Sequence, residues 1–268
     1  MIDAPIILAL LAGAAVGFSL GLIGGGGSIL AVPLLFYIVG IQDPHVVIGT
    51  SALAVAINAL ANFIGHWRAG TVKWPCAVVF GAAGALGAAL GSSLGIVFDG
   101  QKLLFLFALL MYAVGIAMLR PRAFAGDPNV HVTPHRAARL AGIGFGTGTL
   151  SGFFGIGGGF LIVPGIMLGT GMPILNAIGS SLFAVAAFAL TTAVNYALSG
   201  LVDWLTALEF IVGGTVGGFL GMKAAVALAS HRRALNFVFA GIIFTVASYM
   251  LVRTGMPLFF AEAAPIQS

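Results

Sequence analysis

The sequence is poor in charged residues, which make up 7% of its 268 positions. A soluble domain carries about 25% charged residues, so this composition does not supply a surface that faces water on all sides. Hydrophobic residues account for 60% of the chain, and the mean hydropathy is +1.14. Several apolar runs of about 20 residues have the length that crosses a bilayer as a helix. The sequence therefore predicts an all-α polytopic membrane protein.

Cysteine is nearly absent, and basic residues are few and scattered. The single cysteine, Cys76, excludes an intrachain disulfide and a metal site built from clustered cysteines. The net charge of +4 comes from 11 Lys and Arg against 7 Asp and Glu, without a basic patch, so we expect no nucleic-acid partner. The glycines of 144–148 look like a dinucleotide loop, but no strand precedes them. With no nucleophile–base pair either, we expect neither enzymatic activity nor a cofactor.

Glycine is abundant, and it is concentrated in a motif that occurs twice. The first copy, residues 21–33, reads Gly-Leu-Ile-Gly-Gly-Gly-Gly-Ser-Ile-Leu-Ala-Val-Pro, and the second, residues 152–164, reads Gly-Phe-Phe-Gly-Ile-Gly-Gly-Gly-Phe-Leu-Ile-Val-Pro. In both, an apolar run stops at the glycines and a second run meets proline. At 1.5 Å per residue, the run 29–39 is too short to cross a ~30 Å core. Each copy therefore predicts a glycine-tipped hairpin, either re-entrant or a broken helix, and such interrupted helices mark transporter binding sites.

The two motifs belong to a longer internal repeat. Glycines of the first half match glycines of the second at an offset of 131 residues before a one-residue deletion and 130 after it. The matched pairs include Gly13 and Gly144, Gly17 and Gly148, Gly21 and Gly152, Gly84 and Gly214, and Trp74 and Trp204. So many matches through four segments indicate a duplication. We predict a first membrane repeat at 1–119, a basic linker at 120–139 and a second repeat at 140–268, each a hairpin plus three transmembrane helices.

Loop charges predict that the two repeats have inverted topology. The loop with Arg68 and Lys73, and the linker with its four arginines, are basic and therefore expected on the cytoplasmic side. The loop 199–203, which matches 69–73, has no Lys or Arg and ends in Asp203. Equivalent loops are thus expected on opposite sides of the membrane. This topology makes the protein multi-pass and places both termini outside.

Inversion would bring the two glycine tips together near the membrane midplane. Helices beginning near Ser28 and Gly159 would then point their N-termini at a shared point. A helix N-terminus carries roughly +0.5 charge and free N–H donors, which bind small anions without a basic side chain. Neutral donors on the helices that follow would complete the site. These candidates are Thr50, Ser51, Asn58, Asn62, Ser180, Ser181, Thr191, Thr192 and Asn195.

Each of these features also has a purely structural alternative. Glycines spaced four apart form close-packing surfaces, and Ser or Thr hydroxyls in membrane helices often bond their own backbone. Asn58 and Asn62 are costly to bury in a membrane, so for them both alternatives stay open. Glu209 is either an interfacial residue or a proton-coupling carboxylate. Lys223 is expected to extend to the interface and His66 to anchor a helix end.

The doubled motif, followed by Gly-Thr-Ser or Gly-Ser-Ser at the head of the next helix, resembles the TauE/SafE family of sulfite exporters. The resemblance covers about residues 5–255. It implies transport of sulfur-containing anions across a bacterial inner membrane, usually outward. Ile156 and Gly159 replace Gly25 and Ser28 of the first copy, so the second tip is less polar. The site residues that the resemblance implies are Gly24, Gly25, Gly26, Gly27, Ser28, Pro33, Gly155, Gly157, Gly158, Gly159 and Pro164.

The sequence therefore predicts a secondary transporter that exports a small sulfur-containing oxyanion, such as sulfite or a sulfonate. Transport would proceed by alternating access, as two inverted halves rock around a midplane site. A passive anion channel is the alternative within transport. A membrane-embedded enzyme and a membrane scaffold are the alternatives outside it.

Overall fold

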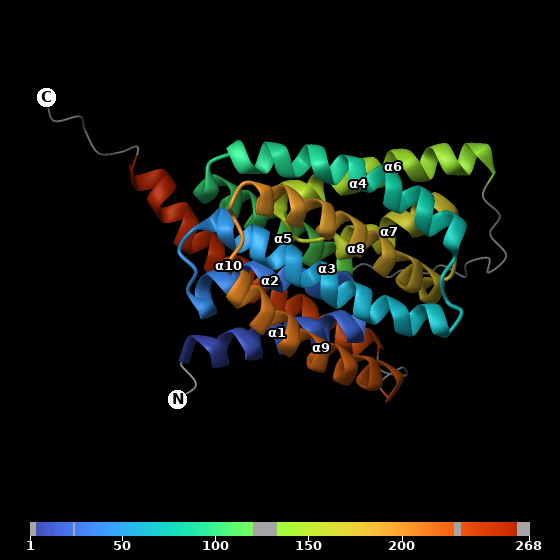
Figure 1. Cartoon of the computed structure of the whole chain (residues 1–268), viewed down its shortest axis with the longest axis horizontal. Helices are drawn as coiled ribbons and strands as arrows, with labels where there is room; N and C mark the ends of the chain where they lie inside the picture. Colours follow the sequence, from blue (N-terminus) through green and yellow to red (C-terminus); the bar gives the residue numbers. More distant parts are fainter. Residues whose placement is uncertain (1–3, 24, 120–132, 228–231, 262–268) are drawn as a thin grey trace, which may run out of the picture. The chain divides into compact units, whose positions relative to one another are not determined.

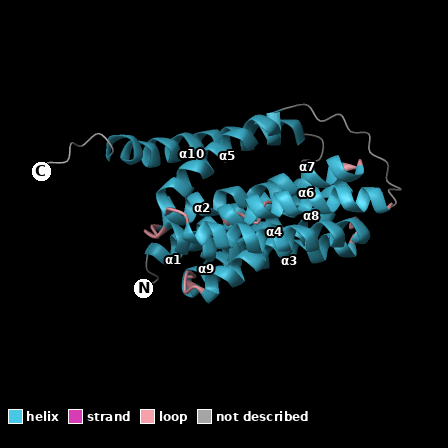
Figure 2. Cartoon of the chain, turned by 90° about the horizontal axis from the view of Figure 1, so that it is seen from above, coloured by secondary structure: helices cyan, strands magenta, loops and turns pink. Residues whose placement is uncertain are grey.

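The computed structural model describes residues 4–23, 25–119, 133–227 and 232–261 of the chain. Throughout these ranges, helices are joined by short loops, and no strand is present (Figures 1 and 2). Seven of the described helices are long and apolar enough to cross a membrane. The predicted all-α polytopic class is confirmed. Gly24, the two ends of the chain and most of the predicted linker lie outside the described residues.

The helix bounds agree closely with the apolar runs of the sequence. In chain order the elements are α1 (Ala4–Ile23), η1 (Gly25–Leu30), α2 (Ala31–Pro33), η2 (Leu34–Val39), α3 (Pro44–Arg68), α4 (Trp74–Val97), α5 (Gly100–Leu119), α6 (Pro134–Phe154), α7 (Gly159–Thr170), α8 (Ile174–Leu198), α9 (Trp204–Ala227) and α10 (Arg232–Ala261). Local chemistry sets several of these bounds. Asp43 begins α3, because its carboxylate accepts the N–H of His45 at 2.8 Å and Pro44 takes the first helical position.

The first glycine-tipped segment is less regular than predicted. We expected an α-helix to begin near Ser28, whereas the chain forms the 3-10 helix η1, the single turn α2 and the π-helix η2. Consecutive glycines have low α-helical propensity, and Pro33 lacks the N–H that would bond the carbonyl of Ile29. The hydrogen-bond spacing therefore changes on both sides of Pro33. Gly40, at φ +91°, ends the segment in a left-handed turn.

The chain divides into two compact units that do not coincide with the two sequence repeats. The first unit comprises 1–96 and 123–229, and the second comprises 97–122 and 230–268. In the second unit, α5 packs against α10, with Phe244 over Gly115 and a hydrogen bond between Tyr112 and Ser248. The first unit holds both glycine-tipped segments. The sequence repeats at 1–119 and 140–268 remain a prediction, because these units describe packing rather than duplication.

The centre of the first unit is formed by α3 and α8. Their most apolar windows are 72% and 67% buried, against 44% or less for the other five candidate membrane spans. The two helices run antiparallel. Gly49, near the start of α3, lies against the backbone of Leu201 just after the end of α8, whereas Gly179, near the start of α8, lies against Thr71 just after the end of α3. Equivalent positions of the two helices therefore lie at opposite ends of the pair.

Glycines pack two further helix pairs closely, and each pair joins the two halves of the sequence. On α1, a side chain at Gly17 would meet the carbonyl oxygen of Gly214 on α9 at 1.9 Å. On α6, a side chain at Gly148 would meet the carbonyl oxygen of Gly84 on α4 at 2.0 Å. These contacts match the repeat, since 17 corresponds to 148 and 214 to 84. The packing alternative for these glycines is confirmed.

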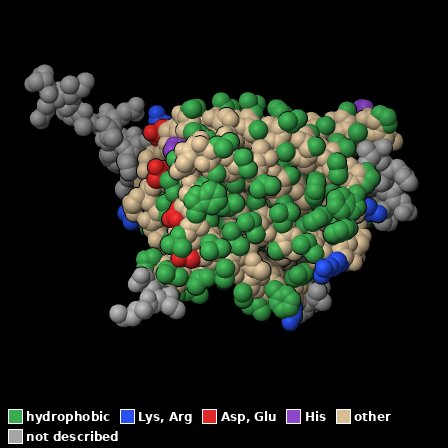
Figure 3. Space-filling view, viewed as in Figure 1, with side chains coloured by type: hydrophobic (Ala, Val, Ile, Leu, Met, Phe, Trp, Pro, Cys, Tyr) green, Lys and Arg blue, Asp and Glu red, His purple; other side chains and the backbone are tan. Residues whose placement is uncertain are grey.

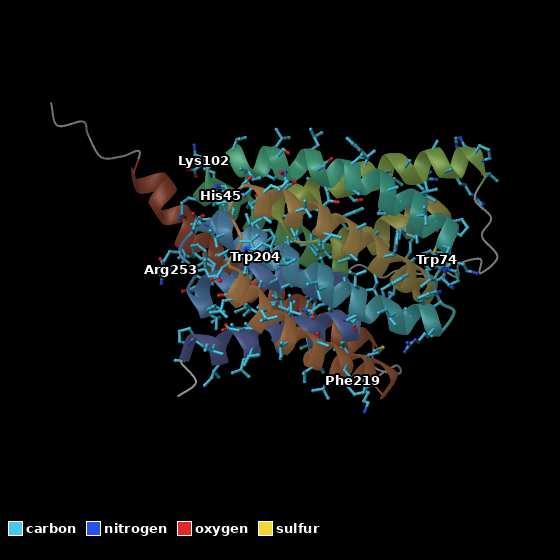
Figure 4. All side chains as sticks on the ribbon, in the orientation of Figure 1. His45, Trp74, Lys102, Trp204, Phe219 and Arg253 are labelled. Atoms are coloured by element: carbon cyan, nitrogen blue, oxygen red, sulfur yellow. The ribbon has the colours of Figure 1, made fainter. Side chains whose placement is uncertain are left out.

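Apolar side chains dominate the molecular surface. Leu86, Leu198 and Leu205 are each at least two-thirds exposed, as expected of side chains that face lipid. On the face shown in Figure 3, hydrophobic side chains cover the middle, and charged side chains lie toward its margins. Figure 4 places Trp74 and Trp204, the first residues of α4 and α9, toward opposite ends of the helices. Both tryptophans are partly exposed, as in the aromatic belts of membrane proteins.

Candidate functional site

The second glycine tip is a tight, buried turn between α6 and α7. Gly155 ends α6 at φ +68°, and Gly157 and Gly158 follow at φ +64° and +63°. The N–H of Ile156 donates to the carbonyl of Ser151 at 3.3 Å, which closes the last turn of α6. Gly158 then serves as the N-cap of α7, whose Leu161 N–H donates to its carbonyl at 2.8 Å. Three left-handed residues in four positions require glycine, so the motif's composition follows from this turn.

This tip is inserted against the middle of the central helix pair. A side chain at Gly157 would meet Val55 of α3 at 2.8 Å and Ala189 of α8 at 3.2 Å. Val55 lies about 16 Å along α3 from Pro44 and about 20 Å from Arg68, at 1.5 Å per residue. The turn is therefore near the middle of α3. Ser51 fixes it there, because its hydroxyl donates to the carbonyl of Gly155 at 3.3 Å as well as to its own helix.

The first tip is described in part. Gly27 and Ser28 are buried, and a side chain at Gly27 would meet the backbone nitrogen of Leu20 at 2.3 Å. This matches the second tip, where a side chain at Gly158 would meet Ser151, the counterpart of Leu20. Gly25 and Gly26 lie in η1, while Gly24 lies outside the described residues.

The structure brings the two glycine-tipped segments into contact. Residues of η1 lie against α7, and η1 also contacts α8. The contact joins segments that are more than 100 positions apart in sequence, which correspond to each other in the repeat. The two contacting segments differ in structure. α7 is an α-helix of twelve residues that begins at the second tip, whereas η1 is a 3-10 helix of six residues. The two tips therefore differ in the helix N-terminus that each presents.

The prolines of the motif lie five or six residues beyond each tip. Pro33 is buried at the end of α2, and Pro164 lies inside α7. Proline has no N–H, so the carbonyls of Ile29 and Phe160 lose their usual donors four residues later. The prolines thus change the helical hydrogen bonding beside the tips, and they supply no donor to an anion.

Thr50 and Ser180, which head the central helices, bind backbone at the ends of the unit. The hydroxyl oxygen of Thr50 accepts the N–H of Asp203 at 3.0 Å, and that of Ser180 accepts the N–H of Lys73 at 2.9 Å. The two bonds are equivalent in the repeat, since 50 corresponds to 180 and 73 to 203. They tie the start of each central helix to the loop that follows the other. Both hydroxyl oxygens therefore already accept a hydrogen bond from the protein backbone.

Asn58 and Asn62 face α9 rather than water. Gly214 makes room for Asn58, because a side chain there would meet the amide nitrogen at 2.1 Å. The Asn58 amide oxygen accepts the hydroxyl of Thr215 at 3.3 Å, and Asn62 donates to the Asn58 carbonyl at 2.8 Å. The Nδ2 of Asn58 is buried without a hydrogen-bond partner in the described structure. Asn58 thus has an unused donor one turn from Val55, which contacts the second tip.

The remaining predicted hydroxyls and amides on α8 divide into three groups. Ser181 and Thr191 donate to carbonyls of their own helix, as Ser and Thr often do in membrane helices. Asn195 donates to Ser92 and Ser93 of α4 at 2.8 and 2.9 Å, toward the end of the helix. Thr192 is buried, and its hydroxyl lacks a hydrogen-bond partner among the described residues.

One residue that the sequence analysis did not select lies directly at the second tip. Ser151 is fully buried, and its hydroxyl has no hydrogen-bond partner among the described residues. Its Oγ lies 2.8 Å from the position that a Cβ on Gly158 would occupy. The available signal was a departure from the repeat, because Leu20 stands at the equivalent position of the first half.

Ionisable residues of the first unit lie away from the tips. Asp43 and Asp203 adjoin the starts of α3 and α9, while Arg68 and Lys73 flank the loop between α3 and α4. Lys223 lies over the ring of Phe219 at 4.5 Å and is exposed, as expected for a side chain that extends to the interface. In the described part of the chain, no three His, Cys, Asp or Glu side chains lie close enough together to hold a metal ion.

His66 has a structural partner at the end of α3. Its Nδ1 lies 3.0 Å from the hydroxyl of Thr71, and that hydroxyl donates to the His66 carbonyl. Phe63 and Trp67, on the same helix, stack at a centroid distance of 6.4 Å. The contacts support the role of His66 as an anchor of this helix end.

Comparison with known proteins gives a consistent result. The family model described as "Sulfite exporter TauE/SafE" matches residues 9–250. A "probable membrane transporter protein" of Xylella fastidiosa is 53% identical over 250 residues, covering 93% of this chain and 96% of that protein. The probable membrane transporter protein YunE of Bacillus subtilis is 31% identical over 239 residues, covering 81% and 85%. A probable membrane transporter protein of Methanocaldococcus jannaschii is 30% identical over 204 residues, covering 72% and 71%. No solved structure matches the chain significantly.

The family match extends across both glycine motifs and nearly the whole chain. The relatives are named as membrane transporters, and the seven apolar helices make this chain a multi-pass membrane protein. The chain belongs to the sulfite exporter TauE/SafE family of membrane transporters.

Proposed function

We propose that the protein is a secondary transporter that exports a small sulfur-containing oxyanion, sulfite or a sulfonate, from a bacterial cell. The observation that carries the proposal is the contact between the two glycine-tipped segments, together with the position of the second tip beside the middle of α3 and α8. Transporters with broken helices bind their substrates near the membrane midplane, where half-helix N-termini face anionic groups. The description of the family, sulfite exporter, supports the choice of anion.

The chemistry of the tips suits a small anion. Glycines leave backbone N–H groups open to close approach, and the N-terminus of α7 adds roughly +0.5 charge. The unpartnered donors of Ser151 and Asn58 lie at or within about one helical turn of this region. Neutral donors bind an oxyanion more weakly than a fixed cation does, which favours release on the other side.

We propose that the binding site opens alternately to the two sides of the bacterial inner membrane. The two inverted repeats would supply the elements that move. Antiparallel α3 and α8 support the inversion, as do the matched bonds of Thr50 and Ser180. The glycine contacts modify the expected movement. A motion that separated the first half from the second would break both close pairs, so α1 moves with α9 and α4 moves with α6.

Reconstitution of the purified full chain into liposomes tests the proposal. Sulfite and a panel of sulfonates should exchange across the bilayer with saturable kinetics, and preloaded unlabelled anion should stimulate uptake of labelled anion from outside. A carrier shows this counterflow because one site serves both faces. A conductance that does not saturate, without counterflow, would instead identify a passive channel. If no anion of the panel moves, the proposed function is wrong.

A further inference from the structure

Ser151 differs from the other hydroxyl-bearing residues of its helix. On α6, Thr147 donates to the carbonyls of Ile143 and Gly144 at 2.9 and 3.0 Å, and Thr149 donates to that of Phe145 at 2.9 Å. These bonds within the helix satisfy a hydroxyl in an apolar environment. Ser151 makes none of them, although it is fully buried. A buried donor left without a partner carries a free-energy cost, which a ligand at this position would relieve.

The position of Ser151 relates this donor to the start of α7. Its Oγ lies 2.8 Å from where a Cβ on Gly158 would stand, and Gly158 is the N-cap of the twelve-residue helix α7. Because residue 158 is glycine, no side chain lies between its backbone and the hydroxyl of Ser151. The first tip has Leu20 in the corresponding position, and its own hydroxyl, Ser28, corresponds to Gly159. Each tip therefore contains one serine, contributed by different positions of the repeat.

The charge available at this site is small. The atoms that a side chain at Gly155, Gly157 or Gly158 would meet belong to apolar residues or to serine. Glu209, five positions before Gly214 on α9, has an acidic side chain and supplies no positive charge to an anion. The N-terminus of α7 contributes roughly +0.5 charge, which is less than one full countercharge. Because the cost of moving an ion out of water rises steeply with its charge, an oxyanion with two negative charges is poorly compensated here.

We infer that the second tip is a binding site for oxyanions that carry a single negative charge, with the Ser151 hydroxyl donating to a ligand oxygen. The inference rests on the proposed function, and it narrows the substrate class to monoanions such as hydrogen sulfite and sulfonates. Sulfate and fully deprotonated sulfite are excluded by charge rather than by size. Ser151 acts as a specificity-determining residue within the tip.

The charge class is tested on the unmodified protein in liposomes, at equal pH on both sides. Methanesulfonate, a monoanion at all relevant pH values, should compete with sulfite uptake, and sulfate, a dianion, should not. Sulfite uptake should fall as pH rises from mildly acidic to mildly alkaline, while methanesulfonate uptake stays constant. Competition by sulfate as strong as that by methanesulfonate would overturn the inference and leave the proposed function intact. Absence of any anion movement would overturn both.

The role of Ser151 is tested with S151A against T147A, which removes a hydroxyl one turn earlier on the same helix. S151A should raise the half-saturation constant for methanesulfonate roughly tenfold or more, the effect of losing a hydrogen bond to a charged ligand. T147A should leave this constant unchanged, because Thr147 bonds its own helix. Equal constants for the two variants would contradict the assignment of Ser151. If S151A does not purify as a monodisperse protein, the competition by methanesulfonate and sulfate decides the inference.

Discussion

The hydroxyl of Thr50 accepts the backbone N–H of Asp203 at 3.0 Å, and the two residues are 153 positions apart in opposite halves of the chain. Its counterpart, Ser180, accepts the N–H of Lys73 at 2.9 Å. The pair shows that polar residues at positions matched between the two sequence halves can serve the contact between those halves. Both hydroxyls lie near the starts of the central helices, five residues before Val55 and Val185.

Replacement of Thr50 or Ser180 by alanine should therefore reduce stability more than it affects substrate binding. Each change removes one hydrogen bond between a central helix and a loop, which contributes about 1 kcal/mol to the free energy of unfolding. Thermal unfolding of the purified variants in detergent should show a lower Tm for each, with an unchanged half-saturation constant in liposomes. A large rise in that constant at unchanged Tm would instead assign the hydroxyl to the substrate.

Two glycines on α6 give a direct test of the helix pairing. Gly148→Ala should destabilise the protein by about 1–3 kcal/mol, because the added methyl group would lie 2.0 Å from the carbonyl oxygen of Gly84. Gly146→Ala, two positions away, meets nothing within 4 Å and should be neutral or slightly stabilising. The Tm of each variant measures the difference. Equal Tm values would contradict the close α4–α6 pair.

The left-handed glycine at the second tip is predicted to be necessary for transport. Gly157→Ala imposes strain at φ +64° and a contact with Val55 at 2.8 Å, so it should nearly abolish transport while membrane insertion persists. Bulky residues at Gly26 and Gly157 should have the same outcome. Initial rates of anion exchange in liposomes, corrected for the amount of inserted protein, provide the measurement.

Gly171→Ala is the matched control for Gly157→Ala. Gly171 has a similar φ of +73°, but nothing lies within 4 Å of an added side chain. This variant should carry a comparable backbone strain of about 1–2 kcal/mol and retain most of its transport. Full transport by Gly157→Ala would show that the tip is not part of the site.

Cysteine labelling tests the inverted topology and the cytoplasmic side of the basic loops. Ala69 and Ser199 are equivalent in the repeat and both exposed, so A69C and S199C can be compared directly in a Cys76→Ala background. A membrane-impermeant maleimide added to intact cells should label S199C and not A69C, since the 69–73 loop is predicted to be cytoplasmic. Labelling of both from the same side would exclude inversion.

The sequence was sufficient for the helices, since apolar length is a local property of the chain. The start of α3 could be read from Asp43-Pro44, and the packing role of Gly17 and Gly148 followed from their spacing. Their partner helices, α9 and α4, could not be predicted, because glycine spacing identifies a packing face of a helix but not the helix that packs against it. The irregular course of η1, α2 and η2 was also missed, since it depends on competition between hydrogen-bond registers around Pro33.

Sequence reasoning identified the candidate site only at residues whose motif occurs in both halves of the chain. The glycines at 155, 157 and 158 were selected because both halves carry the motif. Ser151 could not be identified in this way, because its counterpart in the first half is Leu20 rather than a second serine. Thr50 and Ser180 were selected as donors to an anion, but their hydroxyl oxygens accept backbone N–H groups whose proximity arises only from the three-dimensional fold.

The pairing of α1 with α9 and of α4 with α6 bears on the origin of the chain. A polypeptide with only the first half would leave Gly17 and Gly84 without the backbones that they pack against. Such a half could satisfy both faces by association with a second copy of itself in the opposite orientation. The same contacts would then form between the two subunits of an antiparallel dimer of half-length chains.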